Sequence, residues 1–251
     1  MTLNQFIQNA DFKNYSLVTV NQESPLPAQS MLEKVFDDQP ITVTEQQEPS
    51  DETDAVYLVE DNDVIASSPL KTIQESILLV NSDLYITGNR EVSAVDPPDV
   101  ISQLEDVRFE LRGYPQSNNE KLLLIIISRY IERLAIESDN GRHRASFQRL
   151  SRLDDELGTK HVYEQLAESA VDTHVYGLPD WTPPPELEVT MHGGWSEAFQ
   201  DSWFVVFKPQ SQTAQHAALV ALETSPNCWE AFWTYDTATV NEINRYIEEH
   251  L

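Results

Sequence analysis

The sequence predicts a single α/β domain, whose central sheet is mostly parallel or mixed and is flanked by helices; a mixed α+β arrangement is the alternative. Three observations lead to this fold class. Strand and helix patterns alternate along all 251 residues, without an internal repeat. The stretch 145–181 has the order strand, loop, helix, strand and turn, which is typical of a parallel crossover. The run Trp203–Phe207 is apolar at every position, which indicates a central strand buried on both faces.

The crossover stretch carries most of the unusual polar residues. Ala145–Leu150 alternates as a strand, so Arg149 shares a face with Phe147 and needs an anionic partner if that face is buried. Thr159 is the predicted N-cap of the helix, and Thr173–Tyr176 is the second strand, followed by a turn. The helix is expected to bury apolar side chains that stand three or four residues apart: Val162, Tyr163, Leu166, Ala167 and Ala170.

The strongest helical pattern precedes the crossover and covers Leu122–Ile136. Six consecutive apolar residues at its start predict burial nearly all round, and Ser117 with Glu120 forms a capping box before it. Gly141 is its predicted C-cap. Residues 44–53 are polar, acidic and interrupted by proline, so we expect a flexible loop or linker there.

The other elements follow from shorter patterns of the same two kinds. Helices are predicted over residues 3–10, 27–36, 69–80, 96–105 and 238–247. Strands are predicted over residues 16–20, 41–43, 55–59, 64–66, 84–87, 107–112, 189–192, 217–222 and 231–235.

The charge balance is extreme. With 16 basic and 42 acidic residues the net charge is −26, and the acidic residues are spread along the whole chain. This excess repels nucleic-acid phosphates and anionic membranes, so we expect neither as a partner. The favoured interpretation is a surface adapted to molar salt, which screens such repulsion over short distances, and an ordinary acidic protein is the alternative.

We expect a cytoplasmic protein without disulfides. The single cysteine, Cys228, excludes an internal disulfide and a cysteine metal cage, and is interpreted as a small buried apolar residue. Thr2–Ala10 lacks the basic start and the apolar run of a signal peptide. The longest apolar runs, such as Leu122–Ile127, have six residues and are far shorter than the roughly 18 residues that a membrane-spanning helix needs.

No motif for catalysis or for a known cofactor is present in the sequence. None of the seven glycines forms a phosphate-binding loop, and GxSxG and HExxH are absent. Residues 154–156, all acidic, could hold a divalent cation, but acidic residues also stabilise a helix N-terminus, and this role is favoured. His174 and His192 lie on candidate strands and could meet in space. We therefore expect a protein that is not an enzyme, and its cofactor, if any, is unknown.

A cluster of arginines indicates a local region of positive potential. Arg142, Arg144, Arg149 and Arg152 place four of the ten arginines within eleven residues. They could bind a phosphate, a carboxylate or an acidic segment of a partner. Ion pairing with the acidic residues 154–156 is the favoured alternative.

The tryptophans offer a different indication, because all five lie in the last 71 residues. Trp203 and Trp233 are expected in the core. Trp181 and Trp195 stand beside loops rich in proline or glycine, where the aromatic walls of small-molecule pockets are often found.

Six runs of this sequence are similar to a known family. They are LRGYP (111–115), EKLLLIIISRYIE (120–132), SFQRLSRLDDE (146–156), VYEQLAESAVDTHVYGLPDW (162–181), SWFVVF (202–207) and FWTYD (232–236). Together they resemble the DICT sensory domain, and more narrowly its stand-alone form in halophilic archaea. The resemblance is best over residues 70–236 and looser over the first fifty residues.

The resemblance implies a sensory or signal-input module, with light as one candidate stimulus and no catalytic residues to carry over. No histidine kinase, cyclase or DNA-binding region is attached in this sequence. The output is therefore expected to pass to a partner protein, which the resemblance leaves unnamed.

We therefore predict one sensory domain over residues 1–251 that binds a small ligand or a signalling partner in the cytoplasm of a halophile. Its arginines would hold an anionic group, and its aromatic side chains would enclose a planar one. The predicted recognition surface comprises Arg112, Tyr114, Arg149, Arg152, Tyr176, Trp181 and His192. The alternatives are a ligand-free interaction adaptor and a metal-dependent enzyme that acts on a phosphorylated substrate.

Overall fold

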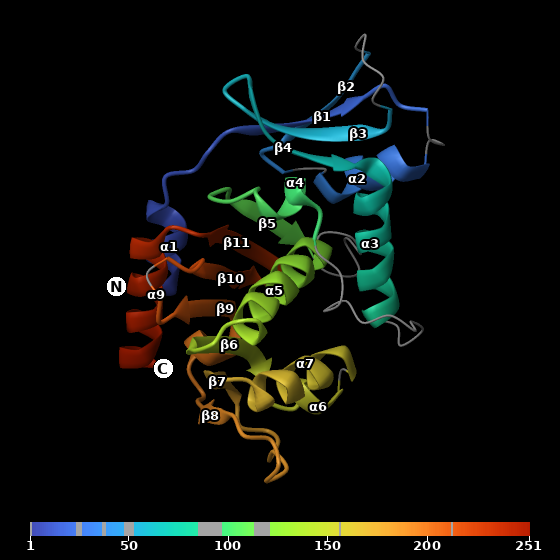
Figure 1. Ribbon diagram of the computed structural model, residues 1–251. Helices are drawn as coiled ribbons and strands as arrows, with labels where there is room; N and C mark the ends of the chain where they lie inside the picture. The colour runs from blue at the N-terminus through green and yellow to red at the C-terminus, as the bar shows by residue number, and fades with distance from the viewer. Residues whose placement is uncertain are drawn as a thin grey trace.

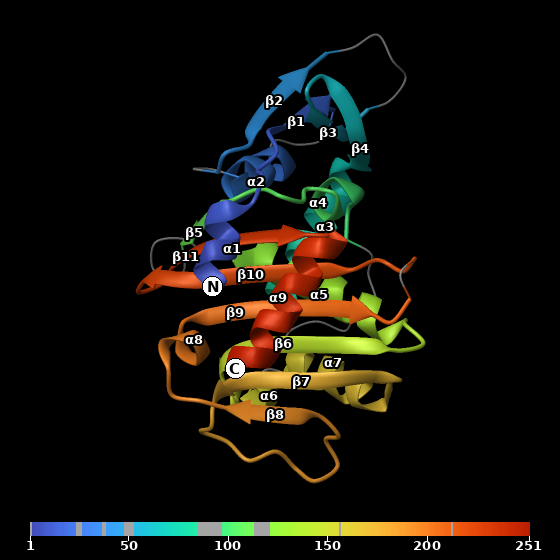
Figure 2. The ribbon, with the colours of Figure 1, turned by 90° about the vertical axis from the view of Figure 1, so that its left-hand side faces the viewer.

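The computed structural model describes residues 2–23, 27–36, 39–47, 53–84, 97–112, 121–155, 157–211 and 213–251. These residues form two β-sheets, a smaller sheet of four strands at one end of the molecule and a larger sheet of seven strands (Figure 1). Helices cover both faces of the larger sheet (Figure 2). The predicted α/β fold class is therefore confirmed.

The larger sheet is mixed. Its strand order is β5-β11-β10-β9-β6-β7-β8, in which β6, β7 and β8 are parallel and the other neighbours are antiparallel. Antiparallel pairs thus outnumber parallel ones, so the mixed form of the prediction is the one observed. The strands are β5 (Phe109–Arg112), β6 (Gly141–Arg149), β7 (Val171–Leu178), β8 (Thr190–Gly193), β9 (Ser202–Pro209), β10 (Ala217–Ser225) and β11 (Cys228–Thr234).

The parallel part of this sheet contains the predicted crossover. β6 leads through α6 (Arg152–Asp155) and α7 (Leu157–Glu168) into β7, which pairs with β6 in parallel. β9 is the central strand, as its apolar sequence predicts. Its side chains alternate between two separate apolar clusters, with Phe204 in one and Phe207 in the other.

Two helical layers enclose the larger sheet (Figure 2). α5 (Lys121–Ile136) and the crossover helices cover one face, while α1 (Leu3–Asn9) and α9 (Thr237–His250) pack together on the other. A short helix, α8 (Glu197–Gln200), leads into β9. Among the described residues, the helices are all too short or too polar to span a lipid bilayer.

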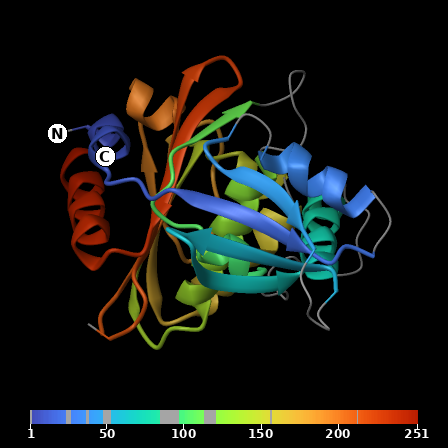
Figure 3. The same ribbon diagram turned by 90° about the horizontal axis from the view of Figure 1, so that it is seen from above.

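The smaller sheet has the order β2-β1-β3-β4, with β1 and β2 parallel and the other pairs antiparallel. Figure 3 looks down on this sheet, with its helices beside it. Most of its buried apolar side chains, including Leu17 and Leu58, belong to the same apolar cluster as those beneath α5. The elements of this part are β1 (Tyr15–Val20), α2 (Pro27–Phe36), β2 (Thr42–Gln46), β3 (Ala55–Glu60), β4 (Asp63–Pro69), α3 (Leu70–Leu84) and α4 (Asp99–Ser102).

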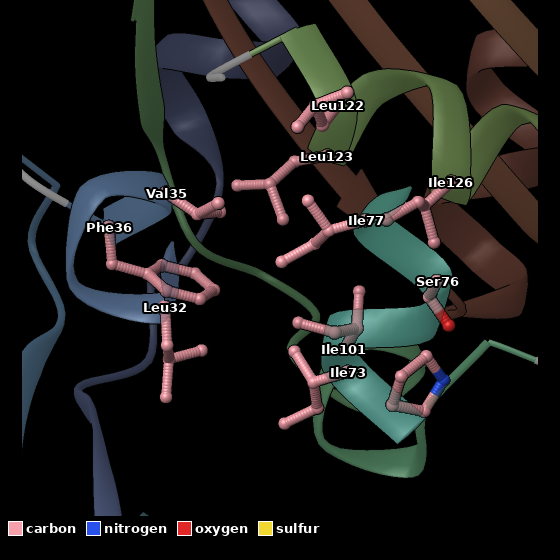
Figure 4. A pocket seen from close by; sticks show the side chains of 11 residues that line it. Leu32, Val35, Phe36, Ile73, Ser76, Ile77, Ile101, Leu122, Leu123 and Ile126 are labelled. Atoms are coloured by element: carbon pink, nitrogen blue, oxygen red, sulfur yellow. The ribbon is translucent and has the colours of Figure 1, made fainter. Parts of the chain in front are cut away.

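A small cavity lies where α2, α3 and α4 meet the start of α5 (Figure 4). Its volume is about 10 Å³, and its walls are almost entirely apolar, including Phe36, Ile77 and Leu123. The hydroxyl of Ser76 is already bonded, because it donates to the backbone oxygen of Thr72 at 3.0 Å. A space of this size and polarity holds at most about one water molecule, so we interpret it as a packing gap at the junction of the two sheets.

α5 carries a buried ion pair into this apolar layer. Arg129 Nη1 lies 2.7 Å from Glu132 Oε2, and Glu132 is only 2% exposed. On α7, the Tyr163 hydroxyl donates to Glu132 Oε1 at 3.1 Å, and Thr159 Oγ1 accepts a bond from Arg129 Nη2 at 2.9 Å. These four residues, which we call the α5–α7 polar cluster, join the two helices by directional bonds as well as by apolar contact.

Thr159 is therefore not the N-cap that the sequence predicts. α7 begins at Leu157, so Thr159 lies inside the first turn, where its side chain is buried and bonded to Arg129. A threonine just before an apolar periodic segment has the pattern of a cap. Only the tertiary contact with α5 distinguishes the two roles.

β6 departs from the predicted alternation near its end. Gln148 has a positive φ of 62°, and the pairing with β7 shifts between Ser146 and Arg149. This β-bulge breaks the two-residue period, so Phe147 packs against the core while the Arg149 side chain is 62% exposed. The expectation that Phe147 and Arg149 share one face is wrong.

Several element boundaries also differ from the predictions. β2 extends to Gln46, so the first part of the predicted loop 44–53 is strand. β4 runs to Pro69, and α3 begins only after it. Gly141 opens β6 instead of capping α5, which ends five residues earlier at Ile136.

The helix predicted over 96–105 is shorter in the structure, where α4 covers four residues. Two other predictions cannot be compared in this way. Residues 85–87 of the strand predicted over 84–87 lie outside the described residues, and so do Ser117 and Glu120 of the predicted capping box.

His143 on β6 is a fully buried polar residue. It is 0% exposed, and neither ring nitrogen has a hydrogen-bond partner among the residues that the structure describes. Its ring lies 5.9 Å from that of Tyr163, on the α7 side of the sheet. Burial, with a smaller effect from His174, lowers the pKa of His143 to about 3. The folded protein therefore holds this ring neutral well below the pH at which an unfolded histidine is protonated.

Acidification should destabilise the fold through His143. Because the folded pKa lies below the unfolded one, this stabilising contribution is complete above about pH 7 and is lost as the pH falls from about 6.5 toward 3. Between about pH 7 and 5 the loss is about 2 kcal/mol. Urea unfolding across this pH range should show that His143→Leu does not have this loss of stability on acidification. His250→Gln, which replaces an exposed histidine, should have the same loss as the wild type. Equal pH slopes in His143→Leu and the wild type would contradict this role.

Removing Glu132 should leave Arg129 buried without its carboxylate. We expect Glu132→Ala to lower the free energy of unfolding by about 3–5 kcal/mol, as for other broken buried ion pairs. The matched control is Glu137→Ala just after α5, whose side chain is 67% exposed and lies 3.8 Å from Arg133. That change should cost less than about 1 kcal/mol. Similar losses in the two variants, measured by urea unfolding, would show that the α5–α7 polar cluster is not a special stabilising feature.

Candidate functional site

A pocket of about 550 Å³ lies on the α7 side of the larger sheet, between α6, α7 and the segment that follows β7. Tyr163 and Leu153 contribute buried side chains to it, and Trp181 contributes a half-buried ring. This volume is within the range of about 300–1,000 Å³ that is usual for small-molecule sites. We call it the Trp181 pocket.

α7 forms one wall of the Trp181 pocket. Its opposite face packs into the core through Val162 and Leu166. Residues three and four apart on a helix share a face, so the remaining side chains form a continuous strip toward the pocket. The strip consists of Lys160, Tyr163, Glu164, Ala167 and Glu168.

Asp180 fixes the start of the facing wall. Its two carboxylate oxygens accept hydrogen bonds from the backbone N–H and the hydroxyl of Ser151, both at 3.0 Å. Arg149 Nη1 lies 3.6 Å from Asp180 Oδ2. Burial alone would raise the pKa of Asp180, but the bonds from Ser151 and the charge of Arg149 hold it below its usual value. The next residue, Trp181, is thereby held beside α6.

The rest of this wall comes from the segment that follows the prolines. It is folded by short backbone bonds, from Leu187 N–H to the oxygen of Pro184 at 3.0 Å and from Val189 N–H to the oxygen of Leu187 at 2.9 Å. Glu186, Leu187 and Glu188 all line the pocket. Leu187 is half-buried, while the two carboxylates are exposed at the rim.

Tyr163 belongs both to the Trp181 pocket and to the α5–α7 polar cluster. Its ring is buried, and its hydroxyl reaches Glu132 on α5. Burial, together with the charge of Glu132, raises the pKa of Tyr163 well above its ordinary value, so the phenol stays protonated and can donate this bond. The pocket is thus in hydrogen-bond contact with α5 through a single side chain.

The opposite face of β7 carries a different polar group. The His192 ring on β8 stacks on the Tyr176 ring at a centroid distance of 4.3 Å, and its Nε2 lies 2.9 Å from His174 Nδ1. His174 Nε2 in turn lies 3.0 Å from Asp172 Oδ2. The expectation that the two histidines meet is confirmed. Burial and the neighbouring His174 and Arg144 charges lower the pKa of His192.

Arginines on β6 connect this group to α9. Arg142 bonds Asp172 on β7 and Glu248 on α9, at 3.3 and 3.0 Å. Arg144 is only 2% exposed; its Nε donates to Asn244 Oδ1 at 2.9 Å, and its Nη1 donates to the Tyr176 hydroxyl. These side chains are fully engaged with one another, which is the arrangement expected of a group that fastens α9 to the sheet.

The structure divides the predicted recognition surface among several places. Tyr176 and His192 lie on the α9 face of the larger sheet, whereas Trp181 lies in the pocket on the α7 face. Arg149 stands close to the pocket but is paired with Asp180.

The remaining three residues lie elsewhere. Arg152 is the half-buried first residue of α6. Arg112 ends β5, at the opposite edge of the sheet from β8, and its side chain is not among those described. Tyr114 lies outside the described residues.

Three of the four clustered arginines pair with acidic residues outside 154–156: the partners of Arg142, Arg144 and Arg149 are Asp172, Glu248 and Asp180. Glu156 lies outside the described residues.

In the acidic run after β6, Glu156 lies outside the described residues. Asp154 bonds Lys160 Nζ at 2.8 Å. Within the described ranges, no three His, Cys, Asp or Glu side chains converge as metal ligands.

The tryptophans follow the predictions in part. Trp233 is buried and stacks on Phe109 at 4.5 Å, and Trp181 lines a pocket. Trp203 is half-buried, and its indole donates to Ser128 Oγ at 3.2 Å. Trp195 is not a pocket wall, because it is 74% exposed.

Sequence reasoning missed Glu132 as part of the site. The only available signal was a carboxylate within a helix whose other positions are largely apolar. Tyr163 was expected in the core, and nothing in its spacing indicated that its hydroxyl would bond Glu132 beside a pocket.

Comparison with known proteins gives one finding on the family. No curated protein and no solved structure matches the chain. A family model matches residues 99–224, just over half of the 251 residues, and includes the pocket, its polar cluster and β5 to β10. The chain therefore belongs to the DICT family, described as a sensory domain in diguanylate cyclases and two-component systems.

Proposed function

We propose that this sensory domain receives its signal as a small molecule bound in the Trp181 pocket. The observation that carries the proposal is the position of Tyr163, which lines the pocket and bonds Glu132 inside α5. The pocket also adjoins the carboxyl ends of the parallel strands β6 and β7. The turns that follow these two strands are joined by the hydrogen bond from Ser151 to Asp180. Ligand sites in open α/β sheets commonly lie at such ends.

A bound ligand can act on α5 through this connection. Any shift of the Tyr163 ring changes the bond to Glu132, and Glu132 is ion-paired with Arg129 in a nearly water-free environment. The first turns of α5 lie at the junction with the smaller sheet, where Leu122, Leu123 and Ile126 border the cavity of Figure 4. α5 thus extends from the pocket to the smaller sheet and is the element that would transmit occupancy.

Native mass spectrometry of the protein purified from the cells that express it tests the ligand. We expect a bound small molecule in the wild type, its loss from Trp181→Leu and its retention in Trp195→Leu, since Trp195 is 74% exposed and outside the pocket. Retention of the mass in Trp181→Leu would place the ligand elsewhere. A bare wild-type protein would remove the support for a ligand-binding sensor.

The adaptor function is the second candidate, and Trp195 is the observation that favours it. It is exposed beside β8, which is an edge strand of the larger sheet and has one unpaired side. Exposed tryptophans are enriched at protein interfaces, and open strands accept a further strand. A protein that co-purifies with the wild type but not with Trp195→Leu, together with an empty pocket, would favour an adaptor over a ligand sensor.

We further propose that the domain works in the cytoplasm of a cell with high internal salt. The chain has 42 acidic and only 16 basic residues, which gives a net charge of −26. Repulsion among the acidic side chains therefore opposes folding unless salt screens it. We expect the midpoint of thermal unfolding to rise by at least about 5 °C between about 0.1 M and 2 M KCl. A midpoint that is constant or falls over this range would instead indicate an ordinary acidic protein.

A further inference from the structure

We propose that the ligand of the Trp181 pocket is an organic cation, with an ammonium or guanidinium group on an apolar body. This inference rests on the proposed function, because it assigns the ligand class of the same pocket. It differs from the anionic ligand that the arginine cluster predicts. Neither Arg149 nor Arg152 lines the pocket, and Arg149 is engaged with Asp180.

The charge of the pocket wall supports a cation. Five of its thirteen lining residues are acidic, against 42 of 251 in the whole chain, so the pocket is more than twice as acidic as the average of this acidic protein. Its one basic residue, Lys160, is already paired with Asp154 at 2.8 Å. A cleft lined by one sign of charge concentrates counter-charged ligands.

The remaining four carboxylates stand on two facing walls. Glu164 and Glu168 are one helical turn apart on α7, and Glu186 and Glu188 border the other wall. A cation between the walls would therefore meet carboxylates on both sides. The α7 strip from Lys160 to Glu168 is about 12 Å long at 1.5 Å per residue, which suits an extended molecule with more than one cationic group.

The aromatic and apolar parts of the pocket favour an organic cation over a bare metal ion as the ligand. Trp181 lines the pocket, and tryptophan is the aromatic side chain that binds ammonium and guanidinium groups best. Leu153, Ala167 and Leu187 provide an apolar surface for a hydrocarbon body. Metal ions prefer converging oxygen ligands, and the described residues contain no such cluster.

Calorimetric titration with spermidine, a flexible triamine, tests the ligand class. In about 1 M KCl the Debye length is about 3 Å, so general attraction to the acidic surface is suppressed and binding inside the pocket is measured. We expect saturable binding of one spermidine by the wild type, weakened about threefold to tenfold in both Trp181→Leu and Glu186→Gln/Glu188→Gln.

Two matched controls separate the pocket from the rest of the surface. Trp195→Leu removes an exposed tryptophan, and Glu242→Gln/Glu249→Gln removes two exposed carboxylates from α9. Both controls should bind spermidine within about twofold of the wild type. Equal weakening in the control and pocket variants would show that spermidine binds the acidic surface at large, which would overturn the inference.

The outcome also separates this inference from the function on which it rests. If neither spermidine nor the guanidinium compound arginine methyl ester binds, while the native mass lost from Trp181→Leu is an anion or a neutral molecule, the ligand class is wrong and the sensor stands. If no ligand of any class occupies the wild-type pocket, both the class and the sensor proposal fail.

Discussion

α5 lies between the larger sheet, α7 and the helices of the smaller sheet, and its burial is the constraint on which the other parts depend. A helix in this position must satisfy every polar group that it brings with it. Arg129 and Glu132 pair with each other through Nη1 and Oε2, and they bond Thr159 and Tyr163 on α7. Because these bonds set how α7 lies against α5, they also set the wall of the Trp181 pocket. The same four side chains therefore join α5 to α7 and fix the position of Tyr163 in the pocket wall.

β7 separates two polar environments by strand alternation. Tyr176 points to the α9 face, where it is held by Arg144 and His192. Beyond the end of the strand, Asp180 bonds Ser151, and the next residue, Trp181, lines the pocket on the α7 face. Side chains close in sequence thus belong to different surfaces, one that fastens α9 and one that lines the Trp181 pocket.

The sequence predicts most elements and the crossover, because these follow from local periodicity. It does not predict the bulge at Gln148, which turns Arg149 away from the face of Phe147, since a single residue in a positive-φ conformation leaves no periodic signal. Trp181 was found as a pocket residue from the loop beside it. Glu132 and the role of Thr159 were missed because their partners are distant in sequence and become neighbours only when α5 meets α7. The arginine cluster was recognised, but its partners Asp172, Asp180 and Glu248 come from other elements.

The packing of α1 has a consequence for the order in which the chain can fold. α1 lies against β10, β11 and α9, and Phe6 contacts Tyr246 with ring centroids 6.0 Å apart (Figure 2). Among the described strands, β5 pairs with β11, through residues such as Phe109 and Ala231. Contacts between residues so far apart in sequence form late, because the entropic cost of closing the long loop between them must be offset first. On the ribosome, α1 and β5 would therefore wait for nearly the whole chain to be synthesised before reaching their final positions.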